Sequence, residues 1–255
     1  MILSPLIILG ALALLLITAG LFEFRYHQLT LINIPVRIHV NGTRGKSSVT
    51  RLIAAGLRAG GLRTFAKTTG TAPRVIDAEG IDRIIHRLRR PSIGEQVRLL
   101  KYFSNEKPDV VVMECMAVQP QYQWISEHQM VKAHIGVITN ARPDHLDEMG
   151  PTEVDVVKSL CNSIPIEGTL VTAEEKHKKI LKSVAKDNQS EIFFSKEESI
   201  SDDELNKFNY IEHPQNIAIA LDVCHKMGIS RDVALDGMHS VQPDFGALVV
   251  WKLKS

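Results

Sequence analysis

The sequence is poor in cysteine and carries almost no excess charge. Its three cysteines, Cys115, Cys161 and Cys224, stand far apart and form no CxxC pair. They indicate neither a disulfide framework nor a zinc site, and they fit a reducing compartment. The 30 basic residues are nearly balanced by 29 acidic ones, whereas nucleic-acid binders usually contain a strongly basic domain. We therefore expect no nucleic-acid partner. Hydrophobic residues make up 44% of the 255 residues, which excludes wholesale disorder.

Charge is absent from the first stretch of the chain. Residues 2–22 contain no charged side chain and consist mainly of Leu, Ile, Ala and Phe. At 1.5 Å per residue, a helix of about 20 residues crosses a hydrocarbon layer of roughly 30 Å. A cleaved signal peptide would carry basic residues before the apolar run; here Arg25, His27 and Arg37 follow it instead. We predict a single membrane anchor over residues 1–24, with the soluble part in the cytoplasm.

The rest of the chain alternates short apolar runs with longer amphipathic segments. The apolar runs are continuous and rich in Val and Ile, as expected for strands with helices on both sheet faces. This alternation predicts an α/β domain with a mainly parallel sheet flanked by helices. The predicted strands are 36–41, 63–67, 109–114, 133–140, 169–172, 192–195 and 208–211. The predicted helices are 46–59, 93–103, 153–161, 174–185 and 216–227.

A glycine-rich loop, here called the phosphate loop, joins the first strand to the first helix. Its sequence is Asn41-Gly42-Thr43-Arg44-Gly45-Lys46-Ser47-Ser48. The two glycines let backbone N–H groups turn toward a ligand, and the helix that follows adds the positive end of its dipole. Lys46 suits the terminal phosphates of ATP, and the Ser47 hydroxyl suits Mg²⁺. The loop is more compact than the usual Walker pattern, because Val40 stands where that pattern has its first glycine.

Two further strand ends carry candidate metal ligands. The strand 109–114 ends in Glu114, which is placed to hold Mg²⁺ directly or through water. The strand 133–140 is followed by Asp144, His145 and Asp147, at the sheet edge where α/β folds bind ligands. A buried, ion-paired glutamate and a polar turn or helix cap are the structural alternatives. The hydroxyl-rich loop 67–71 is expected at the same edge.

Positive charge is concentrated in one part of the chain. Residues 37–90 contain twelve Lys and Arg against three acids. The densest cluster contains Arg83, His86, Arg87, Arg89 and Arg90. It is either a solvated face or a landing surface for a polyanion. Because no aromatic residues interleave the basic ones, single-stranded nucleic acid is a poor ligand for it.

Taken in order, these motifs resemble the central ATP-binding domain of the Mur ligase superfamily. The resemblance covers about residues 34–250 and rests on 41–48, 68–71, Glu114, 144–147 and the segment 212–216 that ends in Asn216. Residues 41–47, 67–71, 93–96 and 114–117, together with the apolar N-terminus, are more closely similar to the ligase subunits of membrane poly-γ-glutamate synthases. The expected domain spans residues 34–255.

The resemblance implies a site and a reaction. Lys46 would contact the β- and γ-phosphates of ATP, Ser47 and Glu114 would hold one Mg²⁺, His145 would hold a second, and Asn216 would meet adenine. Lys46, Glu114 and His145 are thus the expected catalytic residues. A glutamate γ-carboxylate would be activated as an acyl phosphate and attacked by the amine of the next glutamate. The implied partners are glutamate, a polyglutamate acceptor and other membrane subunits of a synthase or export complex.

Two other functions fit the same motifs, and the sequence differs from the Mur ligase pattern at several places. The same loop and anchor would serve a membrane-tethered ATPase that powers or regulates a polymer synthesis or export complex without ligation, and a kinase would leave a stable phosphorylated product. Lys158 follows His145 near the place of the carbamylated lysine of Mur ligases, a match that we treat as accidental. The family's arginine after the adenine region has no counterpart in 243–248, and its C-terminal lid domain is expected to be missing or truncated.

Overall fold

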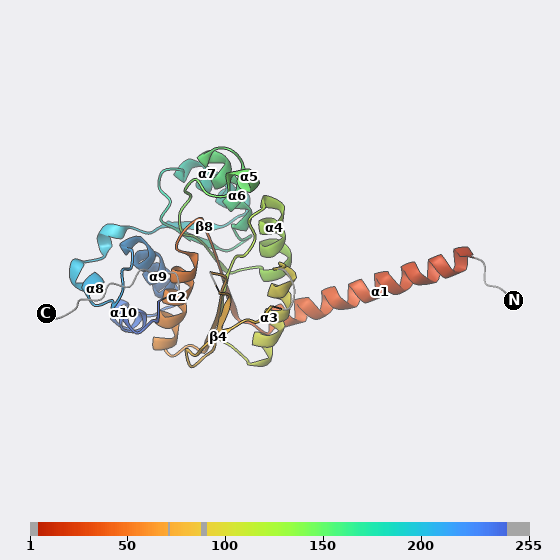
Figure 1. Cartoon of the computed structure of the whole chain (residues 1–255), viewed down its shortest axis with the longest axis horizontal. Coiled ribbons are helices and arrows are strands. Elements are labelled where there is room, and N and C mark those ends of the chain that lie inside the picture. Colours follow the sequence, from red (N-terminus) through yellow and green to blue (C-terminus); the bar gives the residue numbers. More distant parts are fainter. Residues whose placement is uncertain (1–4, 71, 88–90, 244–255) are drawn as a thin grey trace.

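A single eight-stranded sheet forms the centre of the domain that follows the apolar N-terminal run (Figure 1). The computed structural model describes residues 5–70, 72–87 and 91–243. The strand order is β4-β3-β2-β5-β1-β6-β7-β8. The strands are β1 (Val36–Asn41), β2 (Thr64–Thr68), β3 (Arg74–Ile76), β4 (Asp82–Ile84), β5 (Val110–Glu114), β6 (Ile135–Ile138), β7 (Thr169–Thr172) and β8 (Glu191–Phe194).

Helices cover both faces of this sheet. On one face, α2 (Lys46–Ala59) packs with α9 (Pro214–Lys226) and α10 (Arg231–His239), and α3 (Gly94–Asn105) lies on the other (Figure 1). The remaining helical segments are α4 (Pro120–Ile125), the π-helix η1 (Ser126–Val131), α5 (Leu146–Met149), α6 (Glu153–Leu160), η2 (Cys161–Ser163), α7 (Lys178–Asp187), η3 (Glu197–Ser199) and α8 (Asp202–Asn206). Because both faces are covered, the central strands are buried along most of their length.

The predicted α/β class is confirmed. Strands β1, β2, β5, β6, β7 and β8 run parallel, and β3 and β4 form an antiparallel extension at one edge. Helix α2 and strands β1 and β7 have the predicted bounds. The hairpin of β3 and β4 was not predicted, because three residues per strand are too few to show a periodicity.

The predicted strand at 208–211 is wrong. These residues lie within the described part of the chain and form bends and irregular backbone instead of pairing with the sheet. Phe208 and Tyr210 are nevertheless buried, with 7% and 8% of their surface exposed, in the core that α2 and α9 share. The apolar residues therefore indicated a buried segment correctly but not its secondary structure. A short apolar run does not by itself distinguish a strand from other buried segments.

The N-terminal helix α1 (Pro5–Ile32) is longer than the predicted anchor. It is the one helix in the described part that is long and apolar enough to cross a membrane, and it projects away from the sheet (Figure 1). Its last turns enter the domain, where Thr30 and Leu31 are buried. The Arg37 guanidinium donates to the carbonyls of Leu31 at 2.7 Å and Ile34 at 2.8 Å. This contact ties the helix end to the central strand β1.

Candidate nucleotide-binding site

The phosphate loop and its predicted partners meet at one edge of the sheet. Strand β1 pairs in parallel with β5 on one side and β6 on the other, so that Val40 lies beside Glu114 and Asn41 beside Ile138. Strand β2 pairs in parallel with β5 and ends nearby at Thr68. The carboxyl ends of neighbouring parallel strands share an edge, which is where α/β folds bind ligands. The structure therefore brings together the segments that the sequence analysis placed there.

Both glycines of the phosphate loop are required by the backbone. Gly45 has φ 81° and precedes the first turn of α2, a left-handed conformation that side chains disfavour. Gly42 has φ 131°, and a Cβ atom built on it would lie 2.0 Å from Thr139 Oγ1. A larger residue at position 42 would therefore clash with the end of β6.

Polar residues that follow β6 hold this loop, and sequence analysis did not identify them as site residues. The Asn140 carbonyl accepts from Thr43 N at 3.0 Å, and its side-chain Oδ1 accepts from Thr43 Oγ1 at 2.7 Å. Thr139 Oγ1 donates to the Arg44 carbonyl at 2.6 Å. The available signal was a pair of polar residues directly after a buried strand, which is typical of a loop-supporting position.

The Asn41 side chain faces the protein interior. Its Nδ2 donates to Gln123 Oε1 at 2.8 Å and to Ser163 Oγ at 3.1 Å, while its Oδ1 accepts from Gly42 N at 2.9 Å. These contacts anchor the start of the phosphate loop to α4 and η2. Asn41 also lines the adjoining pocket. Because its side-chain amide is engaged in these contacts, Asn41 holds the start of the phosphate loop in position.

A pocket of 360 Å³ opens beside the phosphate loop. Its lining includes Asn41, Gly42, Thr43, Lys46, Thr69, Gly70, Arg87, Cys115, Met116, His145 and Met149. The Lys46 ammonium donates to the Gly42 carbonyl at 2.7 Å and to the Thr43 carbonyl at 3.3 Å. Its charge is therefore centred within the loop, where a phosphate group would be held.

Ser47 and Glu114, the predicted ligands of the first Mg²⁺, are in direct contact. Ser47 Oγ donates to Glu114 Oε2 at 2.8 Å, and Thr69 N donates to the same oxygen at 2.6 Å. The Thr69 hydroxyl also donates to Glu114 Oε1. Glu114 is only 2% exposed. A carboxylate and a hydroxyl are hard oxygen donors that suit Mg²⁺, which keeps several waters and takes phosphate oxygens as further ligands. The donor set therefore fits one Mg²⁺ held by Ser47 and Glu114.

His145 lies in the same pocket, on the loop that follows β6. It is exposed and has φ 48°, a left-handed conformation that is uncommon for a non-glycine residue. Its neighbour Asp144 pairs with Arg44 of the phosphate loop at 3.3 Å. Within the described residues, His145 belongs to no group of three His, Cys, Asp or Glu that could hold a metal. Binding of a second metal by His145 stays a prediction.

Asn216 is close to the phosphate loop but is already engaged. It lies in the first turn of α9 and is 3% exposed, and its Nδ2 donates to Glu212 Oε1 at 2.7 Å. A Cβ atom on Gly45 would lie 2.7 Å from Asn216 Oδ1. Asn216 therefore packs against the turn of the loop, and its contact with adenine stays a prediction.

The predicted basic cluster is divided by the fold. Arg83 is 65% exposed and pairs with Asp77 at 3.2 Å, whereas Arg87 turns into the pocket and pairs with Glu95. Arg89 and Arg90 lie outside the described residues, as do Thr71 and residues 244–255. Lys158 is exposed on α6 and is not among the residues lining the pocket.

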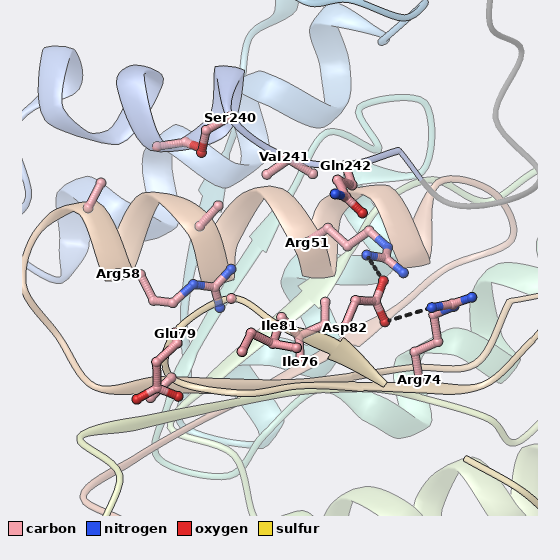
Figure 2. A pocket seen from close by; sticks show the side chains of 15 residues that line it. Arg51, Arg58, Arg74, Ile76, Glu79, Ile81, Asp82, Ser240, Val241 and Gln242 are labelled. Carbon is pink, nitrogen blue, oxygen red and sulfur yellow. Dashed lines mark hydrogen bonds and ion pairs between the residues drawn. The ribbon is translucent and has the colours of Figure 1, made fainter. Parts of the chain in front are cut away.

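The structure also contains a larger cavity of 730 Å³ (Figure 2). It is formed by α2, the β3–β4 hairpin and residues after α10. Figure 2 shows Asp82 between two arginines, with its oxygens 2.7 Å from Arg51 and 3.2 Å from Arg74. None of the phosphate-loop residues 41–48 lines this cavity. The smaller pocket is therefore the candidate nucleotide site, because residues of the phosphate loop line it.

The fold and this site define a member of the Mur ligase family. Residues 40–250 match the family model of the Mur ligase middle domain, and the chain belongs to that family. It is 40% identical to the capsule biosynthesis protein CapB of Bacillus anthracis, over 94% of this chain and 52% of CapB. It is 36% identical to PGA synthase CapB of Bacillus subtilis (strain 168), over 94% of this chain and 62% of that protein. The chain thus spans between half and two thirds of these relatives.

Solved structures share the fold at lower identity. Escherichia coli FolC in complex with DHPP and ADP is 19% identical with a TM-score of 0.63, over 85% of this chain and 59% of FolC. The bifunctional folylpolyglutamate synthase/dihydrofolate synthase with Mn, AMPPNP and L-glutamate bound is 18% identical with a TM-score of 0.64. That match covers 87% of this chain and 61% of the synthase. These similarities support the fold assignment.

Proposed function

We propose that this chain is the nucleotide-binding part of an ATP-dependent amide ligase of poly-γ-glutamate synthesis. The observation that carries the proposal is the joint placement of Lys46, Ser47 and Glu114 at the end of the sheet. The 36–40% identity to the two CapB proteins, one of them named a PGA synthase, supplies the substrate class. The folate-type synthases supply a precedent for nucleotide and metal on the same fold.

The proposed reaction proceeds in two steps. The γ-phosphoryl group of ATP passes to a glutamate γ-carboxylate oxygen, which gives an acyl phosphate and ADP. The amine of the next glutamate then attacks the acyl carbon, the amide bond forms as phosphate leaves, and the amine loses a proton. A bound Mg²⁺ would neutralise the phosphate charge, and Ser47 and Glu114 would hold it.

The protein contributes position and charge to these steps. Lys46 and the loop N–H groups stabilise the charge of the transferring phosphoryl group, as in other phosphoryl-transfer sites. Glu114 keeps the Thr69 loop in contact with the first turn of α2. His145 would hold a second Mg²⁺ at the same pocket, and Asn216 would lie against the adenine. A covalent protein intermediate is unnecessary on this route.

We propose that α1 anchors the protein in a membrane. Its apolar length fits one crossing of the bilayer, and Arg25, His27 and Arg37 favour a cytoplasmic position of the domain. The anchor would keep a polyanionic product beside membrane partners of a synthase or export complex. Alkaline carbonate extraction of membranes tests the anchor, because release of the protein into the supernatant would contradict a spanning helix.

Glutamate-dependent ATP turnover tests the function. The full chain is assayed in membranes, with and without co-expressed membrane partners, for ADP release and for γ-linked product by mass spectrometry. We expect ADP release to require glutamate and to match amide formation. ATP hydrolysis that is indifferent to glutamate would contradict the ligase and favour a tethered ATPase. A stable phosphorylated product would identify a kinase.

A further inference from the structure

Arg87 is a cation in the wall of the nucleotide pocket that the proposed phosphoryl transfer does not use. It follows β4 and lines the pocket together with Lys46, Thr69 and His145. It belonged to the basic cluster of the sequence, but the fold directs it away from Arg83 and into this pocket. Its side chain is 21% exposed, so a ligand in the pocket can reach it.

The guanidinium group of Arg87 is held in one orientation by a bidentate pair. Its Nε donates to Glu95 Oε2 at 2.7 Å, and its Nη2 donates to Glu95 Oε1 at 2.8 Å. A guanidinium has five N–H donors in a planar fork. This pairing occupies one edge and leaves the edge formed by Nη1 and the second N–H of Nη2. Within the described part of the chain, Arg87 forms no other hydrogen bond, and the remaining edge matches a carboxylate geometrically.

Glu95 is itself fixed by its surroundings. It lies in the first turn of α3, where the helix dipole favours a negative charge. Burial opposes its ionisation, but the hydrogen bonds from Arg87 and the charges of Lys67 and Arg87 outweigh it and keep the pKa of Glu95 below its ordinary value. Glu95 thus lies between Arg87 and Lys67, and its bidentate pair with Arg87 fixes the orientation of the guanidinium group.

Lys67 supplies the second cation from inside the protein. It is completely buried, and its ammonium lies 3.7 Å from Glu95 Oε1, beyond hydrogen-bond distance. Among the described residues, its Nζ and both polar side-chain atoms of Gln96 have no hydrogen-bond partner. Glu114 also faces Lys67, but that carboxylate is the proposed Mg²⁺ ligand. Burial lowers the pKa of Lys67, although the carboxylates of Glu95 and Glu114 oppose this shift. Of these groups Arg87 is the cation that lines the pocket, and its charge favours an anionic ligand there.

We propose that Arg87 binds a carboxylate group of the glutamyl substrate through its free edge, with Glu95 and Lys67 as positioning residues. The assignment rests on the proposed ligase function and names the residue that would select a dicarboxylic amino acid or its γ-linked chain. In the proposed site, Lys46 and the N–H groups of the phosphate loop bind the phosphates of ATP. Arg87 is therefore available to bind the carboxylate of the glutamyl substrate. The carboxylate belongs either to the incoming glutamate or to the end of the acceptor chain.

Arg87→Lys tests the assignment, because it keeps the charge and removes the bidentate edge. The full chain in membranes is assayed for KM of glutamate, KM of a γ-linked oligoglutamate, kcat, and the Kd of a fluorescent ATP analogue. We expect one KM to rise roughly 10- to 100-fold, the size of a lost charge-assisted pair, while the nucleotide Kd changes less than about twofold. The substrate whose KM rises identifies the source of the carboxylate.

Controls separate this effect from misfolding. Arg83→Lys changes an exposed arginine of β4 that does not line the pocket and should leave all constants unchanged. Glu95→Gln should reproduce the KM rise, because it releases Arg87, with kcat less affected. The thermal midpoint of each variant reports folding. Unchanged KM for both substrates in Arg87→Lys would overturn the proposal, and so would a weakened nucleotide Kd with both KM values unchanged, which would mark Arg87 as a phosphate ligand.

Failure of this inference is distinguishable from failure of the proposed function. If the unmodified protein ligates and Arg87→Lys ligates equally well, only the assignment of Arg87 is wrong. If the unmodified protein shows no glutamate-dependent turnover, the proposed ligase is wrong, and calorimetric binding of γ-linked oligoglutamate in the presence of the ATP analogue decides the site. Weaker binding to Arg87→Lys then supports the carboxylate site, and equal binding or no binding to either protein overturns it.

Discussion

The hydroxyl of Ser47 donates a 2.8 Å hydrogen bond to the carboxylate of Glu114. This contact joins the first turn of α2 to the end of β5, and it includes the Thr69 loop through the same carboxylate. Three chain segments thus converge on one pair of hard oxygen donors beside the phosphate loop. The relationship explains why a serine after the loop lysine and a glutamate at a strand end belong to one site.

Loss of the loop lysine should strongly weaken nucleotide binding. Lys46→Ala removes the ammonium that lies within the loop carbonyls, and we expect ATP affinity to fall roughly 100-fold or more, because the terminal phosphates lose their point charge. A fluorescent ATP analogue measures the Kd. Lys101→Ala, which changes an exposed lysine on α3, is the matched control. Unchanged ATP binding by Lys46→Ala would refute the assignment of the phosphate loop.

Loss of the buried carboxylate should affect turnover more than nucleotide binding. Glu114→Gln keeps the shape of a side chain that is 2% exposed but removes the charge that favours Mg²⁺. We expect kcat to fall roughly 100-fold and the Mg²⁺ concentration for half-maximal activity to rise. Glu106→Gln, an exposed carboxylate after α3, should have no effect. A Glu114→Gln protein with the same Mg²⁺ dependence as the unmodified one would exclude Glu114 as a ligand.

The second metal ligand is tested separately. His145→Ala removes an exposed ring from the pocket with little effect on packing, so we expect a lower kcat together with a changed Mg²⁺ dependence at nearly unchanged stability. Steady-state rates over a range of Mg²⁺ concentrations measure it, and His177→Ala, on a residue that does not line the pocket, is the control. Undiminished Mg²⁺-dependent turnover in His145→Ala would remove the second-metal role.

A methyl group at the loop turn should disturb nucleotide binding. Gly45→Ala places a Cβ atom 2.7 Å from Asn216 Oδ1 at φ 81°, so strain of about 1–2 kcal/mol is expected. We predict an ATP Kd raised about tenfold, measured with the analogue used for Lys46→Ala. Gly61→Ala has a similar φ of 85° but open space around the Cβ atom. It should destabilise the fold without changing nucleotide affinity. Equal ATP affinity in Gly45→Ala and the unmodified protein would contradict the close packing at this turn.

A buried pair away from the pocket should make stability depend on alkaline pH. His39 Nδ1 lies 2.7 Å from Glu127 Oε2, and both side chains are almost fully buried. Burial disfavours the imidazolium, but Cys115 and Glu127 outweigh it and raise the pKa of His39 to about 10. Because this pKa lies above the unfolded value, the stabilisation is complete below about pH 6.5 and is lost as pH rises through 10.

Glu127→Gln tests this pair. Removing one partner of a buried ion pair costs about 3 kcal/mol or more, and we expect the free energy of unfolding at pH 7 to fall accordingly and its decline toward pH 10 to flatten. Denaturant unfolding of the detergent-solubilised protein at pH 7 and pH 10 measures both. Glu167→Gln, an exposed glutamate, should preserve the original pH dependence. A Glu127→Gln protein with the same alkaline decline as the unmodified chain would contradict the assignment.

Local features of the sequence were sufficient for the class of fold and for the phosphate loop. Continuous Val and Ile runs occur where strands are covered on both faces, and β1, α2 and β7 have the bounds that this pattern predicts. The phosphate loop can be identified from the sequence because its key residues, Gly42, Gly45 and Lys46, lie within a few residues of one another. The apolar run at 208–211 shows the limit of such patterns, because burial of Phe208 and Tyr210 did not require a strand.

The sequence by itself determined the α/β class, the phosphate loop and the apolar N-terminal helix, because each depends on residue types at short spacing. Only the tertiary structure decided which distant side chains meet: Asn140 under the phosphate loop, Glu127 on His39, and Glu95 with Lys67 behind Arg87. The physical reason is that the packing of helices on the sheet determines which partner comes close enough to form a hydrogen bond or an ion pair. That partner is not encoded in the residues next to it along the chain.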